Sequence, residues 1–429
     1  MSAKVVSVKE TLAATDLKAA ARNANISLGL LLAGGAAGIY NMTSHVIPFG
    51  SGFEMVALAQ NLVRHGSFGN PFAVLNTGPT AANPPLYPFL LALIIKVFRV
   101  PEIVVFIATL GNIIANAVSA NLIWRISGLF FKDLRVGVVA AIFWILSSQL
   151  TPSWDVGYTV ATLLIFCLLT ARTISRPRFL ISGIGAGLLA GALFLFNPST
   201  ILISMPWLGW LAYKHRASLK HALFYCCLVC GVLCVAGATW GVRNQEQLGK
   251  FVIRTNLGMT LYASDNDCAR PSLIASEANN CYQAHHPNTS IEEAQLLKNL
   301  GEVNYDQVRR HDAEEWMRTH PIPLLRLTLA RVRDFWFPIA DKHVFQSAVI
   351  WICTVLSIPG LILMVRKRND VTAFVGFVLL IYPLMYYVVV SDVRYRLPVL
   401  WLSLLSASTF VIWCWDLRSG SPRTVKTSI

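Results

Sequence analysis

The sequence has few charged residues for its length. Asp, Glu, Lys and Arg make up only 14% of its 429 residues, whereas a soluble domain carries about 25%. Hydrophobic residues make up 55%, and many apolar stretches are long enough to cross a hydrocarbon layer of ~30 Å. These stretches are continuous rather than alternating, which excludes a transmembrane β-barrel. The composition therefore predicts an all-α polytopic membrane protein.

The sequence also lacks the short motifs of several enzyme classes. It contains no Walker A, HExxH or GxSxG motif, so no P-loop nucleotide site, zinc-protease site or serine-hydrolase site is predicted. Residues 1–25 are polar and basic, and no small-residue cleavage site follows them, so we predict no cleavable signal peptide. Glycines cluster at 34–38 and 183–191 inside apolar runs, a pattern that favours close packing of membrane helices.

Ten apolar runs are predicted to cross the membrane as helices. Their boundaries are 26–42, 102–124, 136–150, 156–171, 179–196, 199–213, 221–241, 344–365, 371–390 and 397–415. A further apolar segment, Pro85–Phe98, has only 14 residues, fewer than the ~20 that a spanning helix needs. We therefore predict a juxtamembrane helix there.

The basic residues indicate how these spans are oriented. If Pro85–Phe98 does not cross and the N-terminus is cytoplasmic, every cytoplasmic segment holds at least three Lys or Arg residues. The whole net charge of +14 then lies on that side, as the positive-inside rule requires. The basic excess thus reflects topology, and no nucleic-acid partner is expected. The predicted location is a multi-pass inner (plasma) membrane with both termini in the cytoplasm.

This topology divides the chain into five segments. They are a cytoplasmic tail (1–25), an N-terminal transmembrane catalytic module (26–241), a large extracytoplasmic loop (242–342), C-terminal helices (343–417) and a second tail (418–429). The first module contains an extracytoplasmic loop of its own, 43–101, which we call loop one; 242–342 is loop two. Loops of this length in a compact protein are usually functional, although a structural cap is an equal alternative for loop two.

Glu54 is the first candidate catalytic residue. It is the sole carboxylate of loop one, and it begins a predicted amphipathic helix over 53–65. Asn61 and His65 follow at spacings that place them on the same helix face. We interpret Glu54 as a general base at the membrane surface. The alternative is an acid that only stabilises the helix N-terminus.

Asp155 is the second candidate catalytic residue. It is the one ionisable residue in a short turn between two predicted spans, and acids at the edge of a membrane core are functional hypotheses by default. The alternative is an interfacial acid in contact with water. In the predicted topology, Asp155 and Glu54 lie on the same side of the membrane.

Three arginines on that side are candidates for binding an anionic head group. They are Arg243, Arg394 and Arg396, and a guanidinium matches phosphate oxygens in a bidentate manner. Snorkelling to lipid phosphates is the alternative for each, and Asp392 is a potential partner for the last two.

Cys268 and Cys281 are the only cysteines in a polar loop. If that loop is extracytoplasmic, they are candidates for a disulfide. Two isolated carboxylates give poor support for a metal site, so we predict no metal and no other cofactor.

The order and spacing of these residues resemble the GT-C membrane glycosyltransferases. The nearest groups are the bacterial relatives of the protein O-mannosyltransferases and the aminoarabinose lipid A transferases. Many of these relatives have Asp where this sequence has Glu54. The resemblance covers most of 26–415 and rests on Ala59–Phe68, Thr77–Ala92, Trp154-Asp155, Phe196–Ser199, Trp240–Asn244, Gly249–Val252, Thr255–Gly258, Leu300–Tyr305, Trp316–Pro321 and Arg394–Pro398.

The resemblance implies a glycosyltransferase that acts at the outer face of the membrane. The donor would be a polyprenyl-phosphate-linked sugar, and the acceptor would be a protein, a lipid glycan or a cell-envelope polymer. An acid of loop one would act on the acceptor nucleophile, and arginines would bind the lipid phosphate. Asn61, His65 and Tyr87 are predicted to position the substrates.

Two other classes of function remain as alternatives. A transporter or flippase for a lipid-linked precursor should place charged residues near the bilayer midplane, whereas the ionisable residues here gather at one face. A non-catalytic family member would keep the fold without needing Glu54 and Asp155.

Overall fold

The computed structural model describes residues 2–44, 49–50, 52–147, 151–175, 179–339 and 343–419, with side chains described from residue 19 onward. Most of the predicted tail at 418–429, and residues 148–150 of the turn before Asp155, lie outside these residues. The described part of the chain is helical and contains no strand, only two isolated β-bridges.

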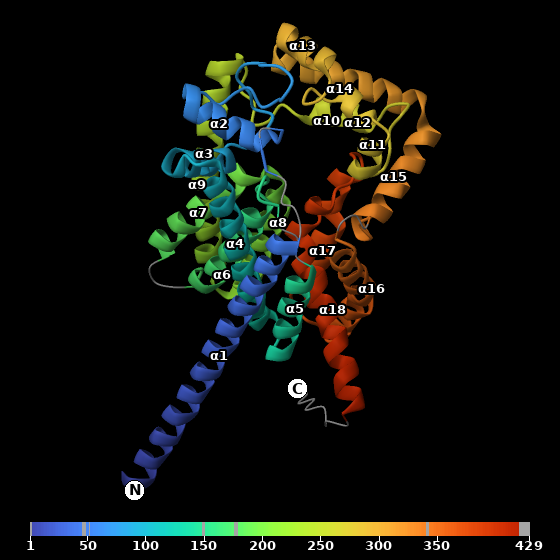
Figure 1. Cartoon of the computed structure of the whole chain (residues 1–429). Helices are drawn as coiled ribbons and strands as arrows, with labels where there is room; N and C mark the ends of the chain where they lie inside the picture. The colour runs from blue at the N-terminus through green and yellow to red at the C-terminus, as the bar shows by residue number, and fades with distance from the viewer. Residues whose placement is uncertain are drawn as a thin grey trace.

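Long helices form a bundle, and the shorter helices of the two loops cover one end of it (Figure 1). The N-terminal part of the bundle contains α1 (Ser2–Ser44), α4 (Pro101–Phe130), α5 (Leu134–Ser147), α6 (Val156–Thr173), α7 (Phe179–Phe196), α8 (Ile201–Lys214) and α9 (Leu219–Leu248). The C-terminal part contains α16 (Val344–Arg366), α17 (Thr372–Ile381) and α18 (Leu397–Arg418), with 3₁₀ turns at Tyr382–Tyr386 and Val393–Tyr395.

Helices from both loops cover this end of the bundle. Loop one contributes α2 (Glu54–His65) and α3 (Leu86–Phe98). Loop two contributes α10 (Leu257–Ser264), α11 (Leu273–Ala278), α12 (Cys281–His285), α13 (Ile291–Leu300), α14 (Glu302–Thr319) and α15 (Pro321–Trp336).

The helices confirm a polytopic membrane protein. Among the described residues, six helices are long and apolar enough to cross a membrane, namely those in α1, α4, α6, α9, α16 and α18. Each of the ten predicted spans contains a helix, and the predicted juxtamembrane segment is α3. The predicted span at 371–390 is α-helical only to Ile381 and continues as a 3₁₀ turn to Tyr386, while 148–150 of the predicted span at 136–150 lie outside the described residues. However, α5 and α8 have 14 residues each and therefore extend only about 21 Å. The arrangement of ten crossings thus stays a prediction.

Glycines let two pairs of helices pack closely, as the sequence predicts. A Cβ on Gly34 of α1 would lie 2.8 Å from Ala117 Cα in α4, and one on Gly187 of α7 would lie 2.6 Å from Val232 Cβ in α9. Large apolar side chains are exposed along α9 and α16. An apolar surface of this extent fits contact with lipid rather than with water.

A small apolar cluster fixes the start of α2 over the bundle. Met55 and Val56 are buried with Tyr87 and Leu91 of α3 and with Phe196 at the end of α7. Because these residues immediately follow Glu54, the burial of the first turn of α2 determines where the Glu54 carboxylate lies.

Candidate active site

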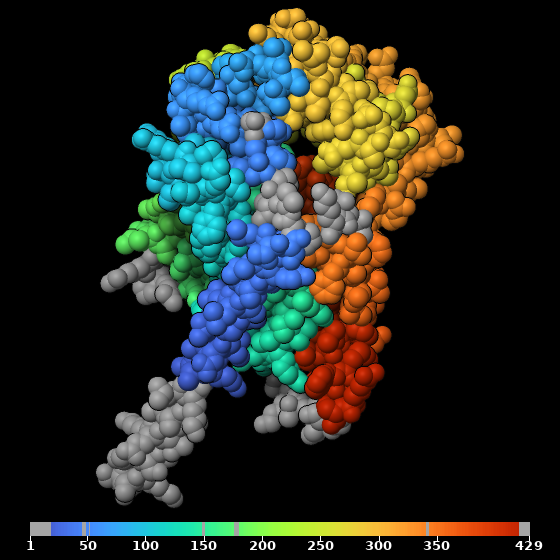
Figure 2. Space-filling model, in the orientation of Figure 1, coloured from blue at the N-terminus to red at the C-terminus, as the bar shows by residue number. Residues whose placement is uncertain are grey.

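A cavity of about 500 Å³ opens between loop one, loop two and the upper ends of the bundle helices. Figure 2 shows the hollow between loop one (blue) and loop two (yellow), with the C-terminal part of the chain (red) behind it. Its charged and polar lining comes from segments far apart in the sequence: Glu54, Asn83, Asp155, Asn197, Ser199, Arg254, Tyr282, His286, Tyr382, Tyr386, Arg394 and Tyr395.

The carboxylate of Glu54 lies at the edge of this cavity. The Asn83 amide donates a hydrogen bond of 2.8 Å to Oε2, and His286 Nε2 lies 3.6 Å from Oε1. The side chain is 12% exposed, so it is shielded but still reachable. Glu54 occupies the first turn of α2, where a negative charge also suits the helix dipole.

Asp155 lines the same cavity from another element. It is the residue before α6, and the Thr159 hydroxyl donates a 2.8 Å hydrogen bond to Oδ2. Burial raises the pKa of Asp155, while the Thr159 hydrogen bond and the charges of Arg254 and Arg394 lower it in part. The net shift is upward, so Asp155 holds its proton more tightly than a carboxyl in water.

The raised pKa of Asp155 predicts that the difference in thermal stability between the wild type and an Asp155→Asn variant changes with pH. Its stabilising contribution is complete below the unfolded-state pKa and is lost as the pH rises through the folded-state pKa. An Asp155→Asn variant lacks this loss, so its thermal midpoint should gain on that of the wild type as the pH rises from about 4 towards neutral. Midpoints measured across this range test the prediction, with the exposed Glu246→Gln as control. A difference that does not change with pH would contradict it.

Arg254 is a cavity residue that the sequence analysis missed. Its Nε donates a 2.9 Å hydrogen bond to the Ala82 carbonyl, and its two Nη nitrogens have no hydrogen-bond partner among the described residues. Although Arg254 is exposed to the solvent-filled cavity, desolvation by the surrounding protein lowers its pKa, and charges that include Asp155 and Glu54 act in the opposite direction. A guanidinium stays charged in such surroundings, so Arg254 presents a cation to the cavity.

Arg394 gives the cavity a second guanidinium. It lies 3.9 Å above the centre of the Trp154 ring, and its Nε lies 3.3 Å from Asp392 Oδ2. Burial lowers the pKa of Arg394, but Asp392 and neighbouring tyrosines outweigh this effect and raise it overall. The indole ring and the carboxylate together hold the guanidinium in place.

Hydroxyl groups line the part of the cavity near the C-terminal helices. Tyr386 donates a 3.1 Å hydrogen bond to Ser199 Oγ, and its ring stacks on Tyr395 with centroids 4.6 Å apart. Tyr382 lies 3.3 Å from Tyr386, hydroxyl to hydroxyl. These groups can donate hydrogen bonds to the oxygen atoms of a ligand.

Two of the predicted phosphate-binding arginines lie elsewhere. The guanidinium of Arg243 donates to the carbonyls of Thr80 and Phe68, at 2.7 and 2.6 Å. Arg396 is buried and donates to the Phe335 and Trp336 carbonyls and the Thr354 hydroxyl. Neither residue lines the cavity, and their donors are used to hold backbone segments together.

The predicted positioning residues also lie outside the cavity. Asn61 is buried and donates to the Ser67 carbonyl at 2.8 Å. His65 is exposed at the far end of α2. The buried Tyr87 donates its hydroxyl proton to the Pro152 carbonyl, so it anchors the turn that carries Asp155.

A buried carboxylate joins the two segments that carry Asn83 and Arg254. Glu302 Oε1 accepts a 2.6 Å hydrogen bond from the Ala81 amide and another from the Thr255 hydroxyl. The Thr255 amide also donates to the Ala81 carbonyl at 3.3 Å. Loop one and loop two are therefore tied together directly behind the cavity wall.

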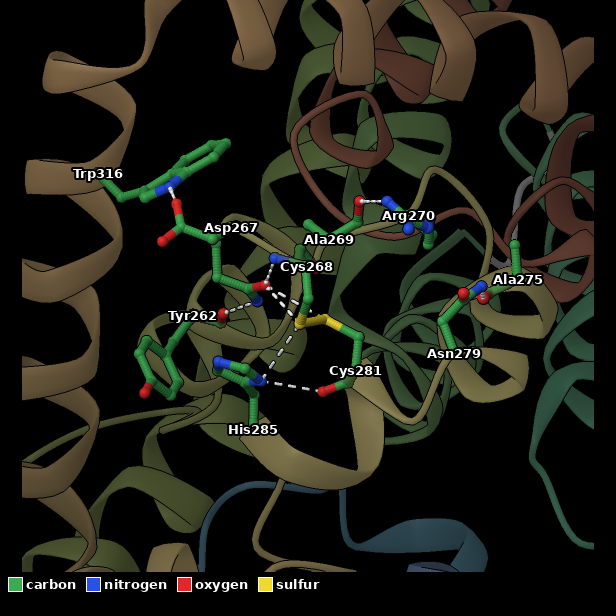
Figure 3. Close-up of a disulfide and its surroundings, with 12 residues drawn as sticks. Tyr262, Asp267, Cys268, Ala269, Arg270, Ala275, Asn279, Cys281, His285 and Trp316 are labelled. Atoms are coloured by element: carbon green, nitrogen blue, oxygen red, sulfur yellow. Dashed lines mark hydrogen bonds between the residues drawn. A yellow bond between two sulfur atoms is a disulfide. The ribbon is translucent and has the colours of Figure 1, made fainter.

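A disulfide closes the part of loop two nearest the cavity. It joins Cys268 and Cys281, the pairing that the sequence left open, and the His285 ring lies beside it (Figure 3). The closed segment contains α11, and Leu273 at its start donates to the Ser391 carbonyl at 2.9 Å. The disulfide thus holds α12 in the wall of the cavity.

Loss of this disulfide should destabilise loop two. A loop closed over 13 residues stabilises the folded chain by about 3 kcal/mol. We expect the Cys268→Ser/Cys281→Ser double variant to unfold at a lower temperature and to be insensitive to reductant. The free, exposed Cys227 provides the control Cys227→Ser. An unchanged thermal midpoint in the double variant would contradict the prediction.

Known proteins resemble this chain in part of its sequence and in its fold. Residues 82–240 match the sequence model of the dolichyl-phosphate-mannose-protein mannosyltransferase family. The chain is similar in structure to the archaeal oligosaccharyltransferase AglB from Archaeoglobus fulgidus, solved with an inhibitory peptide and a dolichol-phosphate. The TM-score is 0.52 at 12% sequence identity, over 91% of this chain and 50% of that one. This chain therefore spans about half the length of AglB. No curated protein matches it.

These findings define the class of the protein as a membrane glycosyltransferase of the GT-C type. Within that class, residues 82–240, less than half of the chain, resemble the dolichyl-phosphate-mannose-protein mannosyltransferase family.

Proposed function

We propose that the protein transfers a sugar from a polyprenyl-phosphate-linked donor to an acceptor on the extracytoplasmic side of the membrane. The observation that carries this proposal is the convergence of two carboxylates, Glu54 and Asp155, and two guanidiniums, Arg254 and Arg394, on one cavity. The carboxylates suit proton transfer and the stabilisation of positive charge, and the guanidiniums suit a phosphate.

The two arginines are assigned to the phosphate of the donor. Arg254 has free Nη donors that face the cavity, and Arg394 is held between Trp154 and Asp392. When the bond from the anomeric carbon to the phosphate oxygen breaks, negative charge grows on the phosphate. Fixed cations in a shielded site stabilise that charge. Arg243 and Arg396 have no part in this assignment because neither lines the cavity and their Nη groups already donate to other parts of the chain.

Glu54 is assigned as the general base. A nucleophilic oxygen of the acceptor attacks the anomeric carbon, its proton passes to the Glu54 carboxylate, and the polyprenyl phosphate leaves. Asp155 is the second carboxylate of the site and faces the positive charge that develops on the sugar ring. One carboxylate takes the proton and the other stabilises the ring.

The position of the cavity fits a donor anchored in the membrane. It lies at the junction of the helix bundle and the covering loops (Figure 2), where a lipid phosphate can enter while its tail remains in the bilayer. The distribution of basic residues supports an extracytoplasmic position for both loops. AglB binds a dolichol-phosphate in its solved structure, which supports a lipid-linked donor for this chain as well.

A comparison of donor classes tests the proposal. Purified protein would be given polyprenyl-phosphate hexoses or pentoses, or the matching nucleotide sugars, with a membrane extract as the source of acceptor. We expect sugar transfer from a lipid-linked donor and none from a nucleotide sugar. Transfer from the nucleotide sugars alone would overturn the proposal.

A further inference from the structure

Loop two brings one residue, His286, to the carboxylate of Glu54 in loop one. Its Nε2 lies 3.6 Å from Glu54 Oε1, and the residue is only 4% exposed. The separation is a few tenths of an ångström longer than a hydrogen bond, as is common for catalytic contacts before substrate binds.

The hydrogen bonds of the imidazole determine where its proton lies. The backbone amide of Asn288 donates a hydrogen bond to Nδ1 at 3.2 Å. Nδ1 is therefore an acceptor, and the neutral ring carries its proton on Nε2. Burial lowers the pKa of His286, although Glu54 and Glu293 oppose this effect. The ring is therefore neutral near pH 7, and the nitrogen that carries its proton is the one 3.6 Å from Glu54 Oε1.

The ring is also fixed from both loops. Tyr282 stacks on it with centroids 4.7 Å apart, and Phe72 of loop one meets it edge to face at 5.9 Å. The Asn288 side chain ties the same turn to loop one, because it donates to the Gly52 carbonyl at 3.0 Å and accepts from the Ala73 amide at 3.0 Å. The two loop-one partners of Asn288, Gly52 and Ala73, lie on either side of Glu54 in the sequence.

We propose that His286 is a positioning residue for Glu54. Its Nε2–H holds Oε1 while the Asn83 amide holds Oε2, so the carboxylate plane is fixed and one lone pair stays open to the acceptor. The base is complete only when loop two is docked on loop one. This inference rests on the proposed function, because it gives Glu54 the role of base.

Two amide substitutions separate positioning from a structural role. Gln at position 286 supplies an N–H near Nε2, whereas Asn supplies only an acceptor near Nδ1. We expect His286→Gln to keep kcat within about threefold of the wild type and His286→Asn to lower it by about tenfold or more, with little change in the KM for donor. If Asn preserves kcat and Gln does not, His286 only holds the 286–290 turn, and the proposal fails.

A second readout does not depend on turnover. Reaction of Glu54 with a carbodiimide can be followed by peptide mass spectrometry in the wild type and in both variants. Removing the donor at Oε1 exposes that oxygen, so labelling should be at least about threefold faster in His286→Asn than in the other two proteins. Equal rates in all three would overturn the positioning role. Unequal rates without any donor turnover would overturn the proposed function alone.

Discussion

Replacing Glu54 with Gln is expected to lower sugar transfer by about two orders of magnitude or more, because an amide cannot take the acceptor proton. The substitution keeps the size of the side chain and the Asn83 contact, so the helix and the cavity should be preserved. Release of polyprenyl phosphate from the lipid-linked donor measures the effect. The loss should fall on kcat rather than on the KM for donor.

An exposed glutamate provides the matched control. Glu246 lies near the end of α9 and is exposed, so Glu246→Gln removes the same charge without touching the cavity. Its activity should equal that of the wild type. If Glu54→Gln retained wild-type kcat, Glu54 would not be the base.

Replacing Arg254 with Gln is expected to lower kcat/KM for the lipid-linked donor by about tenfold to a hundredfold. A hydrogen bond to a charged group contributes about 1.5–3 kcal/mol, and this one would strengthen as the phosphate leaves. Arg254→Lys should recover part of the activity, since a lysine keeps the charge but loses the bidentate geometry. Initial rates over a range of donor concentrations measure both effects.

Arg64 offers the control for this substitution. It is exposed in the last turn of α2 and does not line the cavity. Arg64→Gln should leave kcat/KM unchanged. If Arg254→Gln and Arg64→Gln lost activity equally, the effect would come from the net charge of the surface. The phosphate site would then have to lie elsewhere.

Much of the bundle could be predicted from the sequence because its helices follow from long apolar runs. Every predicted span contains a helix, and the short segment Pro85–Phe98 corresponds to α3. The glycine-rich runs lie where helices pack closely. These features depend on local composition, which a sequence shows directly.

The sequence was a weaker guide to which arginines line the cavity. Arg243 was predicted because the span before it ends near Trp240, but α9 continues to Leu248, so Arg243 lies on the helix. Arg254 follows the turn at Gly249, where φ is +75°, and reaches the cavity. The next residue, Thr255, is held by Ala81 and Glu302, which are distant in the sequence.

A shared helix face was also a weak guide to a shared site. Glu54, Asn61 and His65 lie on one face of α2, yet Glu54 and His65 are the two ends of a helix of 12 residues, about 16 Å apart along its axis. Only the first of them reaches the cavity. His286 and Asn83 approach Glu54 through tertiary contacts that no local pattern indicates.

The most direct test of the account is the fate of a lipid-linked donor in proteoliposomes. The donor would carry a label on its sugar, and acceptor would be present outside the vesicles. We predict that the wild-type protein breaks the bond between sugar and phosphate, and that Glu54→Gln does so at least about a hundredfold more slowly. Movement of intact donor across the bilayer at equal rates in both proteins, without bond cleavage, would contradict the account and indicate a flippase.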